Sequence, residues 1–456
     1  MSPDQSTLDP ATGQLQVAAD GALEPLSVAE LDPSKYTDSP VLEEIDFASD
    51  YDGDVPFGSP VERIDRNRIL PLLQKVEKPG RYTGGEFGVP FKDADSARAR
   101  IVFSYPDTYE LGMSNEGLKI LYDCIQRRSD LYADRTFLPW PDFRQLMKEE
   151  GVSLYSLDQT LAVRSFDVWA FNAAHELHYT NLLYALDLAG IPIKRKDRTA
   201  EDPIIITGGT AVSNPLPLFD FLDGIFMGDG EDAIVEIMDI IAAGKEQGLS
   251  RKQILDSLQS VEGLILPQHY KATIHEDGQA HYYGPVEGKR TYRAKEFAAL
   301  ENVIVPSIAI TQDRVVVEVN RGCGQGCRFC HAGFWKRPVR NAEVSNLVRI
   351  AGDLLKRSGN DTITLHSLSI ADYPWLEELV VEMAQAYGPE GVSLSLPSLR
   401  VQVKTIPVLE MTSGIRKSNV TFALEAGSEL MRERIRKKSS EDNLHYLIRE
   451  IYGRGW

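Results

Sequence analysis

Short apolar runs alternate with helical patterns from about Arg100 onward. Strand-like runs lie at 101–105 (IVFSY), 136–140 (TFLPW), 167–171 (DVWAF), 204–207 (IIIT) and 224–227 (GIFM). The segments between and after them predict helices that begin at Ser114, Pro141, about Tyr179 and about Glu231. Strands that alternate with helices predict a doubly wound α/β domain with a parallel sheet, which we place at residues 99–245.

A parallel sheet of this kind binds its ligands beyond the carboxyl ends of its strands. In this sequence those ends lead into the loops 106–113, 172–178, 208–214 and 228–231. We therefore expect the binding site of the first domain in these loops. His175 and His178 lie in one of them and could ligate a metal, although two scattered histidines are more often ordinary polar residues.

Two segments without this alternation flank the predicted domain. Residues 61–98 form a lead-in segment that Pro79-Gly80 and Gly84-Gly85 divide into turns. Residues 246–310 form a connector, in which β-rich runs flank Asp277-Gly278. That dipeptide is favoured where both turn residues need positive φ, so the connector is expected to contain a hairpin.

A second alternating unit is predicted over residues 311–456. The run VVVEVN (315–320) predicts a strand, and apolar residues from Val344 to Leu355 mark one face of a helix that Gly359 can end. Further strands are expected at 364–370, 392–396 and 420–424, and a last helix at about 441–452. The chain ends directly after that helix, whereas a βα barrel continues into another strand. We therefore expect an incomplete (βα) partial barrel.

Composition excludes fibrous and membrane-spanning proteins. Apolar residues make up 43% and charged residues 25% of the 456 residues, which is typical of soluble globular proteins. No stretch approaches the roughly 18 consecutive apolar residues of a membrane-spanning helix. Met1 to Asp20 also lacks the basic start and apolar run of a secretory signal. The sequence predicts a cytoplasmic protein with no membrane partner.

Negative charge is concentrated at the N-terminus. Of the formal net charge of −18, residues 1–60 hold −12, with thirteen Asp or Glu and one basic residue, Lys35. This segment has no sustained apolar period and cannot bury enough surface to offset its chain entropy, so we expect a disordered acidic tail over 1–60. The remaining −6 indicates no clear nucleic-acid surface, although it leaves room for a local basic one.

Candidate chemistry is concentrated in a cysteine-rich loop. Cys323, Cys327 and Cys330 fall within eight residues, too close for useful disulfides, so a metal site is the natural interpretation. The spacing of three residues and then two lets one tight loop direct three thiolates at a single iron–sulfur cubane, and glycines within 322–326 let the backbone curl around it. Three ligands leave one iron open for a substrate or cofactor.

A structural zinc site with three Cys and one His is the alternative. His331 is adjacent to Cys330, a poor position for closing a tetrahedron, and the sequence has no second CxxC. Cys124 stands alone in a predicted helix, where a buried structural thiol is expected. Lys336, Arg337 and Arg340 follow the loop; they could steer an anionic substrate, balance the charge of a cluster or begin a solvated helix.

At these cysteines the chain resembles a known family. The CxxxCxxC loop, with the aromatic Phe329 before its last cysteine, is similar to that of the radical S-adenosylmethionine (SAM) superfamily. The resemblance implies a [4Fe-4S] cluster on Cys323, Cys327 and Cys330, with SAM bound to the fourth iron through its amino and carboxylate groups. One-electron reduction would then cleave SAM and release a 5′-deoxyadenosyl radical that abstracts hydrogen.

Later segments extend this resemblance. SLSIADY (367–373) lies where the superfamily places a strand-end motif that contacts the amino group of SAM, although its glycine-rich form is absent here. SLPSLR (395–400) and TFALEAGSELMRERI (421–435) resemble later strand ends of the same superfamily. The SAM-binding candidates that these segments imply are Ser367, Ser369, Arg400, Glu425 and Arg432. For the charged residues, a surface charge or a barrel ion pair is an equal alternative.

The first domain resembles the cobalamin (B12)-binding-like domain that often precedes a radical SAM barrel. Residues 107–112 have the spacing of that family's Asp-x-His-x-x-Gly motif, but Tyr109 occupies the histidine position, which excludes ligation of cobalt by that histidine. Turns at 207–209 and 228–231 match later glycine-rich turns, which would let a planar cofactor approach the backbone or would simply close tight βα turns. The corrin-binding candidates are Asp107, Tyr109, Gly112, Gly208, Gly209, Gly228 and Gly230.

From about Arg68 to Trp456 the order of parts resembles an uncharacterised family of cobalamin-binding-domain radical SAM proteins, whose members continue into a six-stranded partial barrel. This resemblance implies a radical SAM enzyme with an unknown substrate, a methyl- or methylthiotransferase or a mutase. It also implies cobalamin as a further cofactor and an electron donor such as a flavodoxin or ferredoxin. Two other interpretations stay open: a non-catalytic iron–sulfur redox or sensor protein, and a zinc-stabilised binding module.

Overall fold

The computed structural model describes residues 39–48, 54–285, 288–292, 297, 299–396 and 421–455. They divide into two units: residues 39–48 with 268–285 form the smaller one, and the remaining residues form the larger one. Within these described ranges, no helix has the length and apolar character that crossing a membrane requires.

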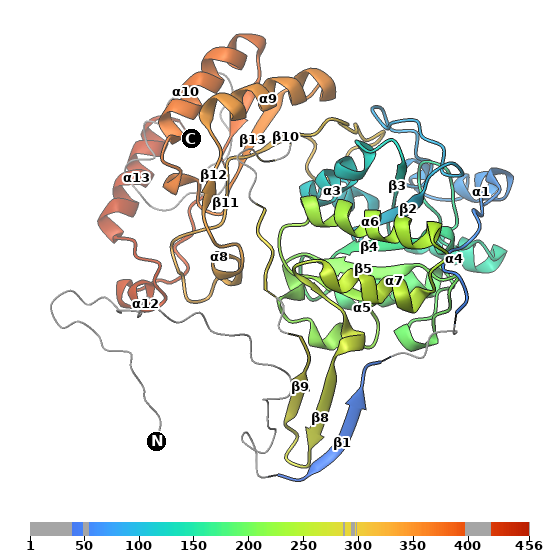
Figure 1. Cartoon of the computed structure of the whole chain (residues 1–456). Coiled ribbons are helices and arrows are strands. Elements are labelled where there is room, and N and C mark those ends of the chain that lie inside the picture. Colours follow the sequence, from blue (N-terminus) through green and yellow to red (C-terminus); the bar gives the residue numbers. More distant parts are fainter. Residues whose placement is uncertain are drawn as a thin grey trace. The chain divides into compact units, whose positions relative to one another are not determined.

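The smaller unit is a three-stranded antiparallel sheet in the order β1-β8-β9 (Figure 1). Its strands are β1 (Val41–Asp46), β8 (Lys271–His275) and β9 (Ala280–Tyr283). The predicted hairpin is confirmed, because β8 pairs with β9 and Gly278 has a φ of 82°. The expectation of a disordered tail over 1–60 is wrong for β1. Pairing with β8 gives this strand backbone hydrogen bonds that its sparse apolar residues could not replace.

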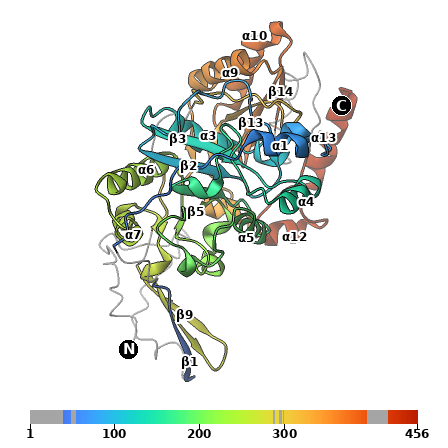
Figure 2. The ribbon, with the colours of Figure 1, turned by 90° about the vertical axis from the view of Figure 1, so that its right-hand side faces the viewer.

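The larger unit begins with a six-stranded sheet in the order β3-β2-β4-β5-β6-β7, parallel except for β7. Its strands are β2 (Ala99–Ser104), β3 (Leu131–Thr136), β4 (Val168–Asn172), β5 (Ile204–Gly208), β6 (Gly224–Phe226) and β7 (Leu264–Ile265). The helices of this part are α1 (Arg66–Leu73), α2 (Tyr109–Gly112), α3 (Glu116–Gln126), α4 (Pro141–Glu150), α5 (His178–Leu188), α6 (Glu231–Glu246) and α7 (Arg251–Ser257). Figure 2 shows α6 and α7 on one side of the sheet and α4 and α5 on the other, as the doubly wound prediction requires.

Burial on both faces explains the apolar runs of this sheet. Every residue of β2 and β3 is buried, and Ile101 and Phe103 of β2 pack in one cluster with residues of α3 and α6. Asn115 begins α3, since its side chain accepts a hydrogen bond from the backbone N–H of Leu118 at 2.8 Å. Ser250 begins α7 through a complete capping box.

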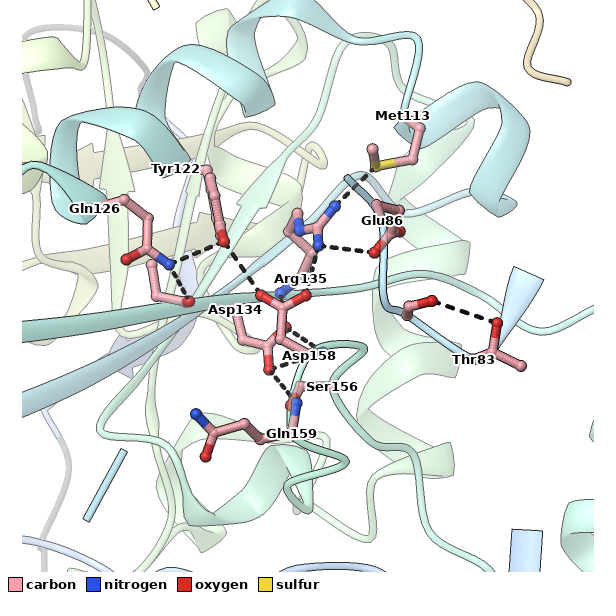
Figure 3. Close-up of polar contacts among 12 residues, drawn as sticks. Thr83, Glu86, Met113, Tyr122, Gln126, Asp134, Arg135, Ser156, Asp158 and Gln159 are labelled. Atoms are coloured by element: carbon pink, nitrogen blue, oxygen red, sulfur yellow. Dashed lines mark hydrogen bonds and ion pairs between the residues drawn. The ribbon is translucent and has the colours of Figure 1, made fainter. Parts of the chain in front are cut away.

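Strand β3 lies at 131–136, so the strand predicted at 136–140 is misplaced. Two charged residues, Asp134 and Arg135, interrupt the apolar pattern of β3, yet both are fully buried. A polar network satisfies them (Figure 3): Arg135 Nη2 lies 2.6 Å from Asp158 Oδ1 and 3.3 Å from Glu86 Oε2. Burial and the neighbouring Asp158 raise the pKa of Asp134 to about 7. The network therefore fastens the lead-in segment to the edge strand.

Two further expectations about this part need correction. The lead-in segment is not only turns, because α1 lies within it and buries Ile69, Leu72 and Leu73. The predicted connector (246–310) also begins too early. Its first part forms α7 and β7, and β7 extends the first sheet by pairing antiparallel with β6. A strand of two residues carries no period that the sequence could show.

The second sheet contains the parallel strands β10 (Val315–Glu318), β13 (Thr362–His366) and β14 (Ser393–Ser395), in that order. A short antiparallel pair, β11 (Asn320–Arg321) and β12 (Arg340–Asn341), flanks the cysteine loop. The helices are α8 (His331–Trp335), α9 (Val344–Ser358), α10 (Leu376–Tyr387), α12 (Glu429–Arg434) and α13 (Glu441–Gly453). α9 and α10 lie side by side and share a core with the sheet (Figures 1 and 2).

Most predicted elements of this second part are present. α9 ends at Gly359, which has a φ of 72°, and α13 covers the predicted last helix. Of the strand predicted at 420–424, residues 421–424 contain only a single β-bridge residue, Phe422, and residue 420 lies outside the described residues. The chain is therefore an α/β protein with two parallel sheets, and the closure of the second sheet into a partial barrel stays a prediction.

Candidate functional site

The order of the first sheet reverses next to β2, which has β3 on one side and β4 on the other. Such a reversal opens a crevice at the carboxyl ends of the strands. A cavity of about 410 Å³ lies at this edge, lined by residues that end β2, β4, β5 and β6. Three of the four predicted loops contribute to it, whereas no residue of 106–113 lines it.

The opposite wall of the cavity comes from the second sheet. It contains residues 316–318 of β10, residues 320–322 that lead into the cysteine loop, Lys336, and residues 366–368 at the end of β13. Apolar side chains dominate the remaining walls, among them Phe103, Phe171, Phe226, Ile234 and Phe297. A largely apolar pocket with a few polar groups at one end is typical of a small-molecule or cofactor site.

The cysteine loop runs between β11 and α8. None of its three cysteines is in a disulfide, and each side chain is partly exposed. The Sγ of Cys330 accepts a hydrogen bond from the backbone N–H of Gly333 at 3.3 Å, as a thiolate ligand does. Gly322 has a φ of 93°, and a Cβ there would lie 2.6 Å from the carbonyl oxygens of Lys336 and Pro338. Only glycine therefore lets the two ends of the loop approach each other.

The donor set fits a three-cysteine cluster. Soft thiolates within one short loop are the ligands that iron–sulfur clusters use. Within the described part of the chain, no three His, Cys, Asp or Glu side chains are grouped so that they could hold a metal ion. The three sulfur atoms are thus not converged on one point, and the loop would have to close around the metal. Gly326, with a φ of 67°, is one position where the backbone can turn.

The predicted strand-end residues Ser367 and Ser369 lie beside the cysteine loop. Ser367 lines the cavity, and its hydroxyl donates to Asn320 Oδ1 at 2.7 Å. Ser369 is buried and donates to Asp372 Oδ2 at 2.6 Å, and Gln325 of the cysteine loop donates to the same oxygen at 2.7 Å. These hydrogen bonds connect the segment that follows β13 to the cysteine loop, as one shared site would require.

The other SAM-binding candidates lie elsewhere. Arg432 is buried, and its guanidinium donates to the carbonyl oxygens of Ala426, Gly427 and Ser439, so it organises its own turn. Glu425 has a φ of 69° and forms an ion pair with Lys437 at 2.6 Å. Neither residue lines the cavity. Arg400 lies outside the described residues.

The corrin-binding candidates separate into two groups. Gly208, Gly209, Gly228 and Gly230 line the cavity, whereas Asp107, Tyr109 and Gly112 do not. Tyr109 is 1% exposed; its hydroxyl donates to Glu86 at 3.0 Å, and burial beside that carboxylate raises its pKa. A Cβ on Gly112 would lie 2.1 Å from the ring of Phe137, so this glycine serves packing. Tyr109 and Gly112 therefore face the protein core, whereas Asp107 is half-buried and accepts from the backbone N–H of Thr108 at 2.7 Å.

Two of the cavity glycines are required by neighbouring backbone. A Cβ on Gly209 would lie 2.4 Å from the carbonyl oxygen of Ala173, and one on Gly228 would lie 2.1 Å from that of Arg290. Close approach of protein thus explains them without a cofactor. Gly208 and Gly230 have looser surroundings, with nearest contacts of 3.6 and 3.2 Å. The residues present do not supply the corrin ligand of the Asp-x-His-x-x-Gly pattern.

Sequence reasoning missed an ion-pair cluster between the turn 228–231 and the cysteine loop. Arg321 Nη1 lies 3.3 Å from Asp229 Oδ1, and its Nη2 lies 2.7 Å from Glu231 Oε1 and 2.8 Å from Glu318 Oε2. Arg340 contacts the second oxygen of Asp229. The only sequence signal was the pair of carboxylates inside a glycine turn, and the cations lie about 90–110 residues further along the chain.

The basic residues after the loop do not begin a solvated helix. Arg340 pairs with Asp229, and Arg337 donates to the carbonyl oxygen of Gly333 at 3.1 Å while lying over the Phe334 ring. Lys336 lines the cavity, and burial lowers its pKa. A half-buried amine at this place could compensate negative charge on a ligand.

Three other candidates lie outside the cavity: Cys124, His175 and His178. Cys124 packs against the core of the first sheet, and burial raises the pKa of its thiol to about 12. His178 is buried, and its Nδ1 accepts from the backbone N–H of Ala174 at 3.2 Å; burial, followed by the nearby His175, lowers its pKa to about 4. Neither histidine lines the cavity.

Comparisons with known proteins match the first and second parts of the chain to separate family models. Residues 117–267 match the family model of radical SAM proteins, N-terminal, and residues 317–455 match that of the radical SAM superfamily. An uncharacterized protein of Methanocaldococcus jannaschii is 23% identical over 348 residues, 75% of this chain and 64% of that protein. A putative methylthiotransferase of the same organism is 22% identical over 311 residues, 65% of this chain and 61% of that protein. The chain thus spans less than two thirds of either relative.

Solved structures of one enzyme share the fold. The radical SAM methyltransferase TsrM from Kitasatospora setae, with cobalamin and a [4Fe-4S] cluster bound, has a TM-score of 0.53 at 11% identity, over 79% of this chain and 65% of that one. A second structure, with tryptophan and the SAM analog aza-SAM bound, gives 0.53 at 12% identity, over 78% and 66%.

Proposed function

The chain belongs to the radical SAM superfamily, and from this premise we propose that it is an enzyme that cleaves SAM reductively at a [4Fe-4S] cluster on Cys323, Cys327 and Cys330. One observation carries the proposal. Arg321, Gly322 and Lys336, which flank the cysteine loop, line a cavity at the carboxyl edge of a parallel sheet, and hydrogen bonds join the loop to the segment that follows β13. A cofactor on an open iron would therefore reach into an apolar pocket.

The cofactors would supply the radical chemistry: one electron passed to bound SAM breaks a sulfur–carbon bond, giving methionine and a 5′-deoxyadenosyl radical that takes a hydrogen atom from the substrate. The chain's own residues would bind the cofactors and enclose the reaction site. The three thiolates hold the metal, and Ser367 presents a hydroxyl at the cavity wall. Phe171, Phe226 and Phe297 line the pocket, and such apolar walls would keep water away from a reactive intermediate.

The reaction consumes one electron per cleavage, so we also propose a protein electron donor of the flavodoxin or ferredoxin class. The substrate class stays open among methyl transfer, methylthio transfer and carbon-skeleton rearrangement. The putative methylthiotransferase among the relatives favours sulfur or methyl transfer.

Cobalamin-assisted methyl transfer is a second candidate, favoured by the fold shared with TsrM, which was solved with cobalamin bound. The glycine turns at Gly208 and Gly230 border the cavity where such a cofactor would lie. The described residues fit cobalamin poorly, because Tyr109 faces the core and the space next to Gly209 and Gly228 is taken by backbone. Quantifying corrin in the anaerobically purified protein decides whether this candidate holds.

Anaerobic reconstitution with iron and sulfide, followed by dithionite and SAM, tests the leading proposal. Wild type is expected to produce 5′-deoxyadenosine, and Cys323→Ala is expected to produce none. Cys124→Ala is the matched control, because this fourth cysteine packs against the core of the first sheet and lies outside the cysteine loop. Zinc at the cysteines would support a binding module. A cluster whose spectrum does not change when SAM is added would support a redox or sensor protein. Either result would refute the proposed enzyme.

A further inference from the structure

Asp229 contacts both ends of the cysteine loop. Its Oδ1 lies 3.3 Å from Arg321 in β11, two residues before Cys323, and its Oδ2 contacts Arg340 in β12. β11 and β12 pair antiparallel, with Arg321 opposite Arg340, so these residues close the base of the loop. The carboxylate of Asp229, in the turn after β6, thus contacts both strands at the base of the loop.

Glu231 adds a second contact to the same base. Its Oε1 lies 2.7 Å from Arg321 Nη2, which also lies 2.8 Å from Glu318 Oε2. The side chains of Asp229, Glu231 and Arg321 are 7%, 6% and 11% exposed. Because buried ion pairs are screened little by solvent, removing one partner leaves a charge that water cannot compensate.

The turn that carries the two carboxylates is itself fixed. Gly228 has a φ of 138°, and no side chain would fit there because the carbonyl oxygen of Arg290 takes its place. The backbone N–H of Asp229 donates to that oxygen at 3.1 Å, and Asp229 Oδ2 accepts from the backbone N–H of Tyr292 at 3.1 Å. The carboxylates are thus pre-positioned by backbone contacts that do not involve the cysteine loop.

We propose that Asp229 and Glu231 are positioning residues, which hold the base of the cysteine loop through Arg321 and Arg340 so that its thiols can converge on a metal. The inference deepens the proposed function and rests on it only for the identity of the metal. In this proposal the turn 228–231 acts through its carboxylates, which hold the loop, and not through contact of its glycines with a cofactor. It also makes the geometry of the loop depend on the first sheet.

Thiol reactivity in the metal-free chain tests the proposal directly. The measurement is the rate at which iodoacetamide alkylates each cysteine, resolved by mass spectrometry. In Asp229→Asn the rates at Cys323 and Cys330 are expected to rise about tenfold, which corresponds to about 1.4 kcal/mol of local opening. Cys124, packed against the core of the first sheet, is the internal reference and is expected to keep its rate.

Asp353→Asn is the matched control, since Asp353 is 53% exposed and pairs with Arg357 on the surface of α9. Its rates are expected to equal those of wild type. Unchanged rates at Cys323 and Cys330 in Asp229→Asn would overturn the proposal. A rise shared by Cys124 would also overturn it, because it would report general unfolding. If Asp229→Asn does not fold, Glu231→Gln is judged by its rates at Cys323 and Cys330, with circular dichroism instead of Cys124 as the check on folding, because Glu231 contributes to the raised pKa of the Cys124 thiol.

A second readout separates this inference from the proposed function. After reconstitution, Asp229→Asn and Glu231→Gln are expected to bind less iron per chain than wild type while their circular dichroism is unchanged. Iron content equal to wild type in both variants would contradict the positioning role. If wild type itself bound no iron, the proposed function would fall, and the alkylation rates would still decide whether the carboxylates hold the loop.

Discussion

Replacing Tyr109 by Phe tests whether the residue in the histidine position of the cobalamin motif faces the core. The tyrosine hydroxyl donates to Glu86 Oε1 at 3.0 Å, its side chain is 1% exposed, and its ring packs edge-on against Phe137 with the centroids 5.6 Å apart. Tyr109→Phe keeps this ring packing and deletes one hydrogen bond to a buried carboxylate. The remaining partner of Glu86 in the network is Arg135, at 3.3 Å from the other oxygen.

A buried hydrogen bond to a charged group contributes about 1.5–3 kcal/mol, so the variant is expected to lose about 2 kcal/mol of unfolding free energy. Urea denaturation followed by circular dichroism measures this loss, and the slope of the transition is expected to stay that of wild type. Tyr452→Phe is the control, since this tyrosine is 73% exposed and surface changes usually stay within about 0.5 kcal/mol. A Tyr109→Phe protein as stable as wild type would refute the buried position of Tyr109.

Three further predictions concern the same domain. Arg135→Met leaves two carboxylates, Glu86 and Asp158, without their guanidinium partner and is expected to cost about 3–5 kcal/mol in urea denaturation; a loss under about 1 kcal/mol would contradict the network. The pKa of Asp134, raised from 3.8 to about 7, means that the folded state favours the protonated carboxyl group. The contribution of this group to the free energy of unfolding is complete below pH 4 and is lost as the pH rises through 7. Relative to Asp134→Asn, wild type is therefore expected to lose up to about 4 kcal/mol of unfolding free energy between pH 4 and 8. A difference in unfolding free energy between the two proteins that stays constant over this range would refute the prediction. Gly228→Ala puts a Cβ 2.1 Å from a carbonyl oxygen and is expected to cost at least about 2 kcal/mol, seen as a lower Tm, whereas Gly151→Ala, with open space around it, is expected to cost about half as much.

The sequence predicted those elements whose apolar period is undisturbed. β4, β5 and α9 lie within one residue of their predicted starts, because their apolar residues recur at the spacing of a buried strand or an amphipathic helix. β3 was misplaced because its two buried charges have partners that no local pattern connects to it. Glu86 and Asp158 pair with Arg135, and the backbone N–H groups of Asp158 and Gln159 donate to Asp134. β1 and β7 depend on partners distant in sequence.

The candidate site was predictable to a similar extent. The spacing of three cysteines within one short loop predicts a metal site without tertiary information, and the strand-end segment at 367–373 lies beside that loop as expected. The role of the turn 228–231 could not be predicted, since Asp229 and Arg321 meet only in the folded chain. A glycine also looks the same in sequence whether a cofactor or a neighbouring backbone occupies the space beside it, as Gly209 and Gly228 illustrate.

Electron paramagnetic resonance of the reconstituted, dithionite-reduced protein, recorded with and without SAM, reports whether one iron of the cluster is open to the cofactor. The account predicts the signal of a reduced cubane in wild type, a clear change of that signal when SAM is added, and loss of both in Cys327→Ala. A cubane signal in wild type that stays identical after SAM is added would contradict the account, because it would mean that no iron of the cluster is open to the cofactor.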